Sequence, residues 1–284
     1  MDELRTCTVE NGRRVAWAEY GDPNGVPIVF SHGTPGGRLG VAHHHDGYLR
    51  QGLRVISPDR PGYGATGPLP GRSVYDAARD TLAILDVCGL DRVFAVGGSG
   101  GGPHALALAV AAPERIRSVG VFVGAAPLLA EEIDGQVAIN QAVMARLDEP
   151  AALRELLNQV RTSLLEQGLA AVLADAPDID KLRWAEHAES RQRSIDDALA
   201  PGVQGMADDY RAIFGGAWGF EPSQVAVPVV WAHGDQDRNV PVSAARRIAE
   251  QLPDCRFVNW TEVGHSPGPD LLAEFYTAVL ASAR

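Results

Sequence analysis

The chain has 284 residues and a formal net charge of −11, from 36 acidic and 25 basic side chains. Nucleic acids and anionic membrane surfaces attract clustered Lys and Arg, so this balance argues against both as partners. Hydrophobic residues make up 45% and charged residues 21%, which is ordinary for a soluble globular protein.

Cysteine usage and the first residues exclude further classes. Cys7, Cys88 and Cys255 form no CxxC or Cys/His spacing, so neither a disulfide framework nor a zinc site is expected. The N-terminus is charged and lacks the basic start and apolar stretch of a secretory signal. The longest apolar run, 118–130, contains Pro127 and is too short to span a bilayer. We therefore expect a cytoplasmic protein.

Short apolar runs alternate with helical stretches along most of the chain. The runs predicted as strands are Arg14–Tyr20, Val26–Ser31, Leu53–Pro58, Arg92–Gly97, Ser118–Val123, Val227–His233 and Arg256–Trp260. Several are apolar at successive positions, which is typical of strands buried on both faces. Helices are predicted at Ser73–Val87, Gly102–Ala111, Val242–Gln251 and Leu271–Ala283. The first has Ser73 and Asp76 in a capping-box-like spacing and stops at Gly89. This alternation predicts an α/β protein with a mostly parallel central sheet flanked by helices.

Residues 128–224 break the alternation. They contain no convincing strand but several amphipathic helical stretches, such as Pro150–Gln167 and Ile179–Gln192. A helical insertion of this length predicts a cap over the sheet, with residues 1–127 and 225–284 forming the core. A long crossover on one face of the sheet is the alternative.

The segment Gly97-Gly98-Ser99-Gly100-Gly101 has the pattern G-x-S-x-G between a predicted strand and an Ala-rich helix. A sharp strand-to-helix turn strains the serine backbone and leaves no room for side chains at the flanking positions, so it requires glycine there. The turn would place Ser99 at the carboxyl edge of the sheet, beside a helix N-terminus that favours an oxyanion. No Lys follows in the loop, so phosphate binding is not predicted.

With this turn in place, the chain resembles the α/β-hydrolase fold family over essentially its whole length. Four loops carry the resemblance in the family's order: His32–Gly36, Asp59–Gly64, His233–Pro241 and Glu262–Pro267. The first follows the strand Val26–Ser31, and the resemblance implies that the backbone N–H groups of Thr34 and Gly100 form an oxyanion hole. Asp59–Gly64 is a structural loop without assigned chemistry.

The resemblance also implies a Ser–His–Asp triad. The family's acid lies in the loop after the strand Val227–His233, usually as G-x-x-D, which selects Asp237 over its neighbour Asp235. A serine hydroxyl needs a base to take its proton, and His suits that role near neutral pH when a carboxylate orients it. Among the histidines, only His265 follows both partners in sequence. The expected order on this fold is Ser99, Asp237, His265.

Other candidate residues are more ambiguous. His43-His44-His45 resembles a metal-binding tract, although consecutive positions of a helix point in different directions and a solvated helix start is the alternative. His104 is expected either at the acyl pocket or as a structural residue behind it. Arg38 is expected at the surface or against an anionic substrate group. The cap carries Met144, Trp184, Tyr210, Phe214, Trp218 and Phe220, which are expected in the core or against an apolar or aromatic substrate.

Together these observations predict a serine hydrolase that cleaves an ester or related acyl bond of a small molecule through an acyl-enzyme, with no metal or cofactor. One alternative is an aminopeptidase resembling proline iminopeptidases, with Glu131 and Glu132 binding an amine, although that group generally has Trp where this chain has Gly100. Carbon–carbon bond hydrolases, lactonases, thioesterases and perhydrolases share the triad. A non-catalytic receptor on the same fold is the remaining alternative, and the sequence does not indicate the oligomeric state.

Overall fold

The computed structural model of the chain describes residues 3–10, 12–168 and 174–283. Its centre is an eight-stranded sheet in the order β1-β2-β4-β3-β5-β6-β7-β8. The strands are β1 (Arg5–Thr8), β2 (Arg14–Gly21), β3 (Val26–Ser31), β4 (Leu53–Pro58), β5 (Val93–Gly98), β6 (Ile116–Phe122), β7 (Val229–Gly234) and β8 (Cys255–Trp260). Pairs β1–β2 and β2–β4 are antiparallel, and all the others are parallel. The prediction of a mostly parallel sheet is confirmed.

Every predicted strand is present, with its ends shifted by two residues or fewer, and β1 is added at the antiparallel edge. The successive apolar residues bury both faces of the sheet, as in β3, where Ile28 and Val29 are both buried but belong to different hydrophobic clusters. A strand of this kind needs a layer of helices on each side.

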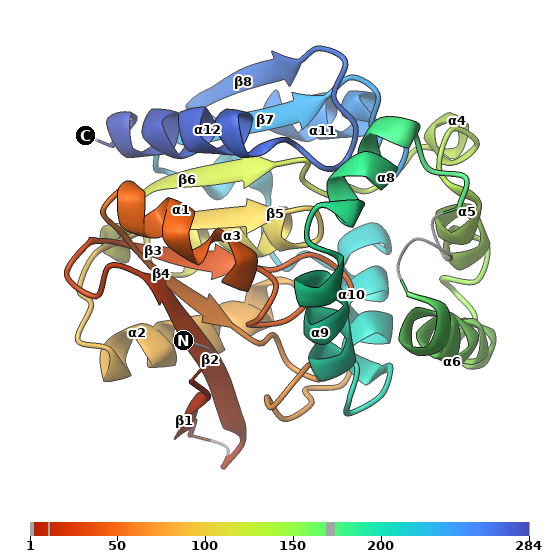
Figure 1. Cartoon of the computed structure of the whole chain (residues 1–284), viewed down its shortest axis with the longest axis horizontal. Helices are drawn as coiled ribbons and strands as arrows, with labels where there is room; N and C mark the ends of the chain where they lie inside the picture. Colours follow the sequence, from red (N-terminus) through yellow and green to blue (C-terminus); the bar gives the residue numbers. More distant parts are fainter. Residues whose placement is uncertain (1–2, 11, 169–173, 284) are drawn as a thin grey trace.

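Helices cover both faces of the sheet (Figure 1). On one face α2 (Ala78–Val87), α3 (Gly101–Ala111) and α11 (Val242–Ala249) contribute to the largest hydrophobic cluster. On the other face α1 (His45–Arg50) and α12 (Pro269–Ala281) contribute to the second cluster, with Tyr48 and Phe275 among its members. Short 3-10 turns lie at Ala42–His44, Tyr75–Ala77, Pro113–Arg115 and Pro222–Gln224.

The helix predicted at Ser73–Val87 starts slightly later than expected. The turn Tyr75–Ala77 leads into α2, and the expected capping contact is present, since Ser73 Oγ accepts from the Asp76 N–H while Asp76 Oδ2 accepts from the Ser73 N–H. The helix ends before Gly89, whose φ of +65° suits glycine.

Between β6 and β7 the described residues form helices only. They are α4 (Ala130–Ile133), α5 (Ala138–Met144), α6 (Pro150–Gln167), α8 (Asp178–Ala185), α9 (Ala188–Ala198) and α10 (Gln204–Phe214), called the cap helices below. They gather beyond the arrowheads of the parallel strands, at the carboxyl edge of the sheet (Figure 1). The prediction of one helical stretch over Ile179–Gln192 is wrong, because the helix breaks after Ala185 and a second one begins at Ala188. The two helices pack differently: Trp184 on α8 donates a hydrogen bond to the 262–267 loop, whereas Ile195 on α9 belongs to the hydrophobic cluster of the cap helices. No helix in the described part of the chain is both long and apolar enough to cross a membrane.

Candidate active site

Ser99 occupies a strained turn between β5 and α3. Its φ is +53°, which a side-chain-bearing residue rarely adopts. The glycines around it are required by close packing, because a Cβ at Gly97 would overlap the carbonyl of Gly101 and a Cβ at Gly101 would overlap that of Ser31. The turn therefore presents Ser99 at the carboxyl edge of the sheet, where the sequence pattern predicts it.

Ser99, His265 and Asp237 form a continuous chain of hydrogen bonds. Ser99 Oγ lies 2.9 Å from His265 Nε2, and His265 Nδ1 lies 2.8 Å from Asp237 Oδ2. With Asp237 ionised, Nδ1 carries the proton and donates a hydrogen bond to the carboxylate, which leaves Nε2 free to accept from the serine hydroxyl. The three residues come from the loops after β5, β7 and β8, which meet at one edge of the sheet.

The structure brings Asp237, and not Asp235, to the histidine. Asp237 Oδ1 accepts from the N–H groups of Asn239 and Val240 at 2.8 and 2.9 Å, which fixes the carboxylate. Asp235 is exposed and accepts from the Glu262 N–H instead. Burial acts to raise the pKa of Asp237, but the charge of His265 and hydrogen bonds from both neighbouring imidazoles outweigh it and hold this pKa well below its usual range.

His265 is half-buried beside two carboxylates. Burial acts to lower its pKa, but the charge and hydrogen bond of Asp237, together with the charge of Asp180 on α8, raise it above the ordinary value. Asp180 is fully buried and accepts from the backbone N–H of Ser266 at 2.8 Å. Trp184, on the same helix, donates from Nε1 to Ser266 Oγ at 2.6 Å. A cap helix therefore anchors the loop that carries His265.

The loop after β3 lies against Ser99. A Cβ added to Gly33 would be 3.5 Å from Ser99 Cβ, and a Cβ at Gly100 would be 3.0 Å from Thr34 Cβ and would overlap Thr34 Oγ1. Within the described ranges, no protein acceptor takes the backbone N–H of Thr34 or of Gly100. Two uncommitted backbone donors thus flank the serine, as an oxyanion site requires.

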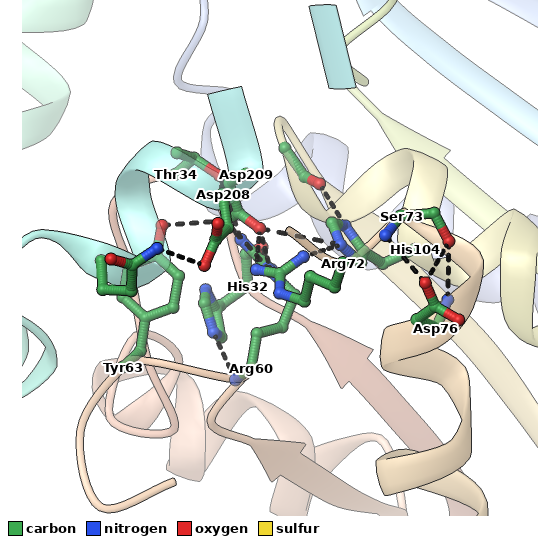
Figure 2. Close-up of polar contacts among 12 residues, drawn as sticks. His32, Thr34, Arg60, Tyr63, Arg72, Ser73, Asp76, His104, Asp208 and Asp209 are labelled. Atoms are coloured by element: carbon green, nitrogen blue, oxygen red, sulfur yellow. Dashed lines mark hydrogen bonds and ion pairs between the residues drawn. The ribbon is translucent and has the colours of Figure 1, made fainter. Parts of the chain in front are cut away.

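A buried carboxylate on cap helix α10 holds this loop from behind (Figure 2). Asp209 Oδ2 accepts from Thr34 Oγ1 at 2.7 Å and from the Tyr63 hydroxyl at 2.9 Å. The guanidinium groups of Arg60 and Arg72 both pair with the same carboxylate. Burial acts to raise the pKa of Asp209, but the two arginines hold it well below its usual range. Asp209 belongs to no sequence motif, and the motif loop that contains Arg60 carries no recognisable catalytic pattern.

His104 and Arg38 belong to buried polar networks and do not line the cavity. His104 Nδ1 lies 2.8 Å from the carbonyl of Gly100, and burial, with the nearby Arg60, lowers its pKa to about 3, so the neutral ring donates to that carbonyl. Arg38 is buried and bonded to Asp59 and Asp197, which corrects both expectations for it. It joins the core to cap helix α9.

A cavity of about 780 Å³ lies over Ser99, between the sheet edge and the cap helices. Its apolar lining includes Phe30, Phe122, Val123, Ile195, Met206 and Tyr210. Of the cap residues named from the sequence, Trp184 and Tyr210 line it, whereas Trp218 and Phe220 belong to the large core cluster and Met144 and Phe214 pack against clusters. Only part of that group therefore lines the cavity.

The histidine tract divides between two environments. His45 Nδ1 accepts from the Gly21 N–H, away from the others, while His43 and His44 line the cavity with their ring centroids 4.0 Å apart. No group of three or more metal-ligating side chains that could hold an ion is found in the described part of the chain. The three cysteines are free thiols.

Comparisons with known proteins agree with this architecture. The sequence pattern of the alpha/beta hydrolase fold family matches residues 26–269 of this chain. A non-heme chloroperoxidase of Streptomyces lividans is 28% identical over 95% of this chain and 99% of its own length. The dihydrolipoyllysine-residue acetyltransferase component of the acetoin cleaving system of Pseudomonas putida is 29% identical over 89% of this chain, which spans 62% of that protein. The enol-lactonase of Burkholderia xenovorans LB400 superposes with a TM-score of 0.74 at 19% identity, covering 98% of this chain and 100% of its own, which is a likeness of fold. The family match covers most of the chain, and the chain therefore belongs to the alpha/beta hydrolase fold family, as its motifs predict.

Proposed function

We propose that the protein is a serine hydrolase that cleaves an ester or related acyl bond of a small, largely apolar molecule. The observation that carries the proposal is the hydrogen-bonded chain from Ser99 through His265 to Asp237 at the floor of the cavity. A nucleophile, a base and an orienting carboxylate in this arrangement are the parts that acyl transfer needs.

Each residue has a defined role in the proposed reaction. Ser99 Oγ attacks the carbonyl carbon while its proton moves to His265 Nε2, and Asp237 stabilises the resulting imidazolium. The N–H groups of Thr34 and Gly100 stabilise the negative charge on the carbonyl oxygen. The imidazolium then protonates the leaving alcohol, which leaves an acyl-enzyme. Water, deprotonated by His265, attacks this ester, and the acid departs as Ser99 regains its proton.

We also propose that residues 128–224 form a cap domain on a core made of 1–127 and 225–284. The cap helices share a hydrophobic cluster that includes Val143, Leu153, Leu157 and Leu164, and Tyr63 is its member from the core segment. The substrate would therefore bind between two units, as the position of the cavity suggests.

The aminopeptidase alternative gains no support from the cap carboxylates. Glu131 is exposed, and Glu132 is bound to Ser243 and Arg247. Neither side chain lines the cavity. Ester hydrolysis is thus better supported than aminopeptidase activity.

The test is Ser99→Ala, assayed with p-nitrophenyl acetate and butyrate and with a fluorophosphonate that labels activated serines. We expect the wild type to turn over both esters and to be labelled at Ser99. The variant should lose labelling and at least about 10³-fold in kcat. Turnover at the wild-type rate by Ser99→Ala would refute the proposal, and labelling without turnover would favour a receptor.

A further inference from the structure

Arg191 on α9 lines the same cavity as Ser99 and His265. The buried arginines of the chain, Arg38, Arg60 and Arg72, each pair with a carboxylate. Arg191 is half-buried, and no carboxylate of residues 3–10, 12–168 or 174–283 forms an ion pair with it. Its Nε is buried and has no hydrogen-bond partner there either.

The neighbours of Arg191 do not compensate its charge. Glu186 is near enough to act on it, but that carboxylate pairs with Arg183 at 2.7 Å. The other close groups are imidazoles, and the ring centroid of His43 lies 4.0 Å from that of His44 and 4.8 Å from that of His187, with the rings tilted. Burial, with the charge of Arg191, lowers the pKa of His44 to about 4, so this ring is neutral near pH 7 and offers no countercharge.

A partly buried guanidinium without a counterion carries a desolvation penalty that a bound anion relieves. The planar, fixed donors of Arg match a carboxylate better than any other common anion apart from phosphate. His43 Nε2, on the same cavity wall, is also buried without a partner among the described residues, so two unsatisfied nitrogen groups adjoin one surface of the cavity.

We propose that Arg191 binds a carboxylate carried by the substrate, so that the protein acts on monoesters of dicarboxylic acids in preference to neutral esters. The inference rests on the proposed function in treating the bound anion as a substrate. The apolar side chains of the cavity, including Ile195, Met206 and Tyr210, suit an aliphatic spacer between the ester and the acid group.

The kinetic test compares monomethyl and dimethyl esters of the diacids from succinate to suberate. The wild type should show, for at least one chain length, a kcat/KM about tenfold or more higher for the monoester than for the diester. Arg191→Gln should abolish this preference, mainly through a higher KM for the monoester, so that the ratio of the two kcat/KM values falls to about one. Arg191→Lys, which keeps the charge but not the planar donors, should keep part of the preference.

The matched control is Arg193→Gln, which removes the same charge from an exposed position of the same helix. It should leave the preference intact, and melting temperatures should verify that all variants fold. Three outcomes would overturn the proposal. They are an equal loss of kcat/KM for both esters in Arg191→Gln, a loss of the monoester preference in Arg193→Gln, and a wild type with a higher kcat/KM for the diester at every chain length.

A binding measurement separates this proposal from the proposed function. Titration calorimetry with the free diacids on Ser99→Ala should give binding that weakens about tenfold or more in the double variant with Arg191→Gln. No binding of any diacid, or equal binding by both proteins, overturns the carboxylate site even when esters are hydrolysed. Binding that depends on Arg191, together with no esterase activity and no fluorophosphonate labelling of the wild type, supports the carboxylate site and refutes the hydrolase instead.

Discussion

His265 Nδ1 is 2.8 Å from Asp237 Oδ2, and this contact raises the imidazole pKa above its ordinary value in spite of burial. A general base acts in its neutral form, so kcat/KM should fall as the pH drops through this pKa. Asp237→Asn removes the negative charge that raises the pKa of His265. The inflection in the pH profile of kcat/KM should therefore move to lower pH. The variant should also lose about 10⁴-fold in kcat, because the orienting carboxylate is gone.

The measurement is a pH profile of kcat/KM from pH 5 to 9 for the wild type and Asp237→Asn. Asp235→Asn is the matched control in the same loop, and its exposed side chain accepts only from the Glu262 backbone among the described residues. Its profile should coincide with that of the wild type. A flat wild-type profile, or an inflection unmoved by Asp237→Asn, would contradict the base role.

Gly100 is the residue at which a single methyl group should test the oxyanion site. A Cβ there would overlap Thr34 Oγ1 and lie 3.3 Å from Ile213 Cδ1, so Gly100→Ala must displace the loop that carries Thr34. We expect kcat to fall about 10²–10³-fold, as when an oxyanion donor is lost, with a small change in KM. Gly135→Ala is the control, since its nearest neighbour, the Glu132 carbonyl, is 3.9 Å from the added carbon. An unchanged kcat in Gly100→Ala would argue against the assigned donors.

Ser99 and the glycines around it were predictable because the local backbone geometry allows few other residues there. The turn at Ser99 has room only for glycine at positions 97 and 101, so the sequence around it forms a recognisable motif. The choice of Asp237 over Asp235 came from resemblance, and the structure supplies its physical reason: two backbone N–H groups hold Asp237 while Asp235 faces solvent. The pattern alone does not encode that difference.

Helix α10 is joined to the core by two arginine ion pairs that share one buried carboxylate, Asp209. Replacing Asp209 by Asn leaves Arg60 and Arg72 buried without a countercharge, so the free energy of unfolding should fall by about 3–5 kcal/mol. The Thr34 hydroxyl loses its charged acceptor as well, so kcat should fall more than KM rises. Urea unfolding at pH 7 and steady-state kinetics at a temperature where the variant is folded measure the two effects.

Asp208→Asn is the neighbouring control on α10. Asp208 is also buried, but it accepts from the Gly71 N–H and the Gln204 amide, and no arginine forms an ion pair with it among the described residues. We expect a loss below about 1.5 kcal/mol and normal kcat. Equal destabilisation by the two substitutions would show that burial, rather than the arginine pairs, sets the role of Asp209.

The sequence could not reveal Asp209 or Asp180, because neither belongs to a local pattern. Each lies in an amphipathic helix whose polar residues look like a solvated face, and its partners are distant in the chain: Thr34 for Asp209 and Ser266 for Asp180. Helical periodicity predicts that a helix exists, but its rotation and docking depend on tertiary packing. The break between α8 and α9 was missed for the same reason.

Across the whole molecule, the cap helices are attached to the core by ionic contacts on several sides, each of which has at least one buried partner. Asp209 pairs with Arg60, Asp197 with Arg38 and Glu132 with Arg247. Opening the cap as a rigid lid would break these pairs together, which is costly for buried charges. The mostly parallel sheet was predictable from the alternation of strands and helices, and the helical content of this region from the break in that alternation, whereas the attachment was not.

The buried histidines should make the whole fold sensitive to mild acid. Burial lowers the pKa of His104 to about 3 and that of His32 well below 6.5. In the unfolded chain these groups take up protons below about pH 6.5, and in the folded protein they do not. Stability is therefore lost as the pH falls from about 6.5 toward the folded pKa, and each of the two should cost about 2 kcal/mol at pH 5. His265 has a raised pKa and acts in the opposite direction.

Urea unfolding at pH 8, 6.5 and 5 measures this slope, above the range in which most carboxylates titrate. His104→Gln keeps an amide donor for the Gly100 carbonyl and has no titrating ring. It should lower stability at every pH but reduce the loss between pH 8 and 5 by about 2 kcal/mol. His187→Gln replaces an exposed histidine and should leave the loss unchanged. If the wild type is as stable at pH 5 as at pH 8, or if His104→Gln keeps the full dependence, then buried neutral imidazoles do not control the acid sensitivity of the fold.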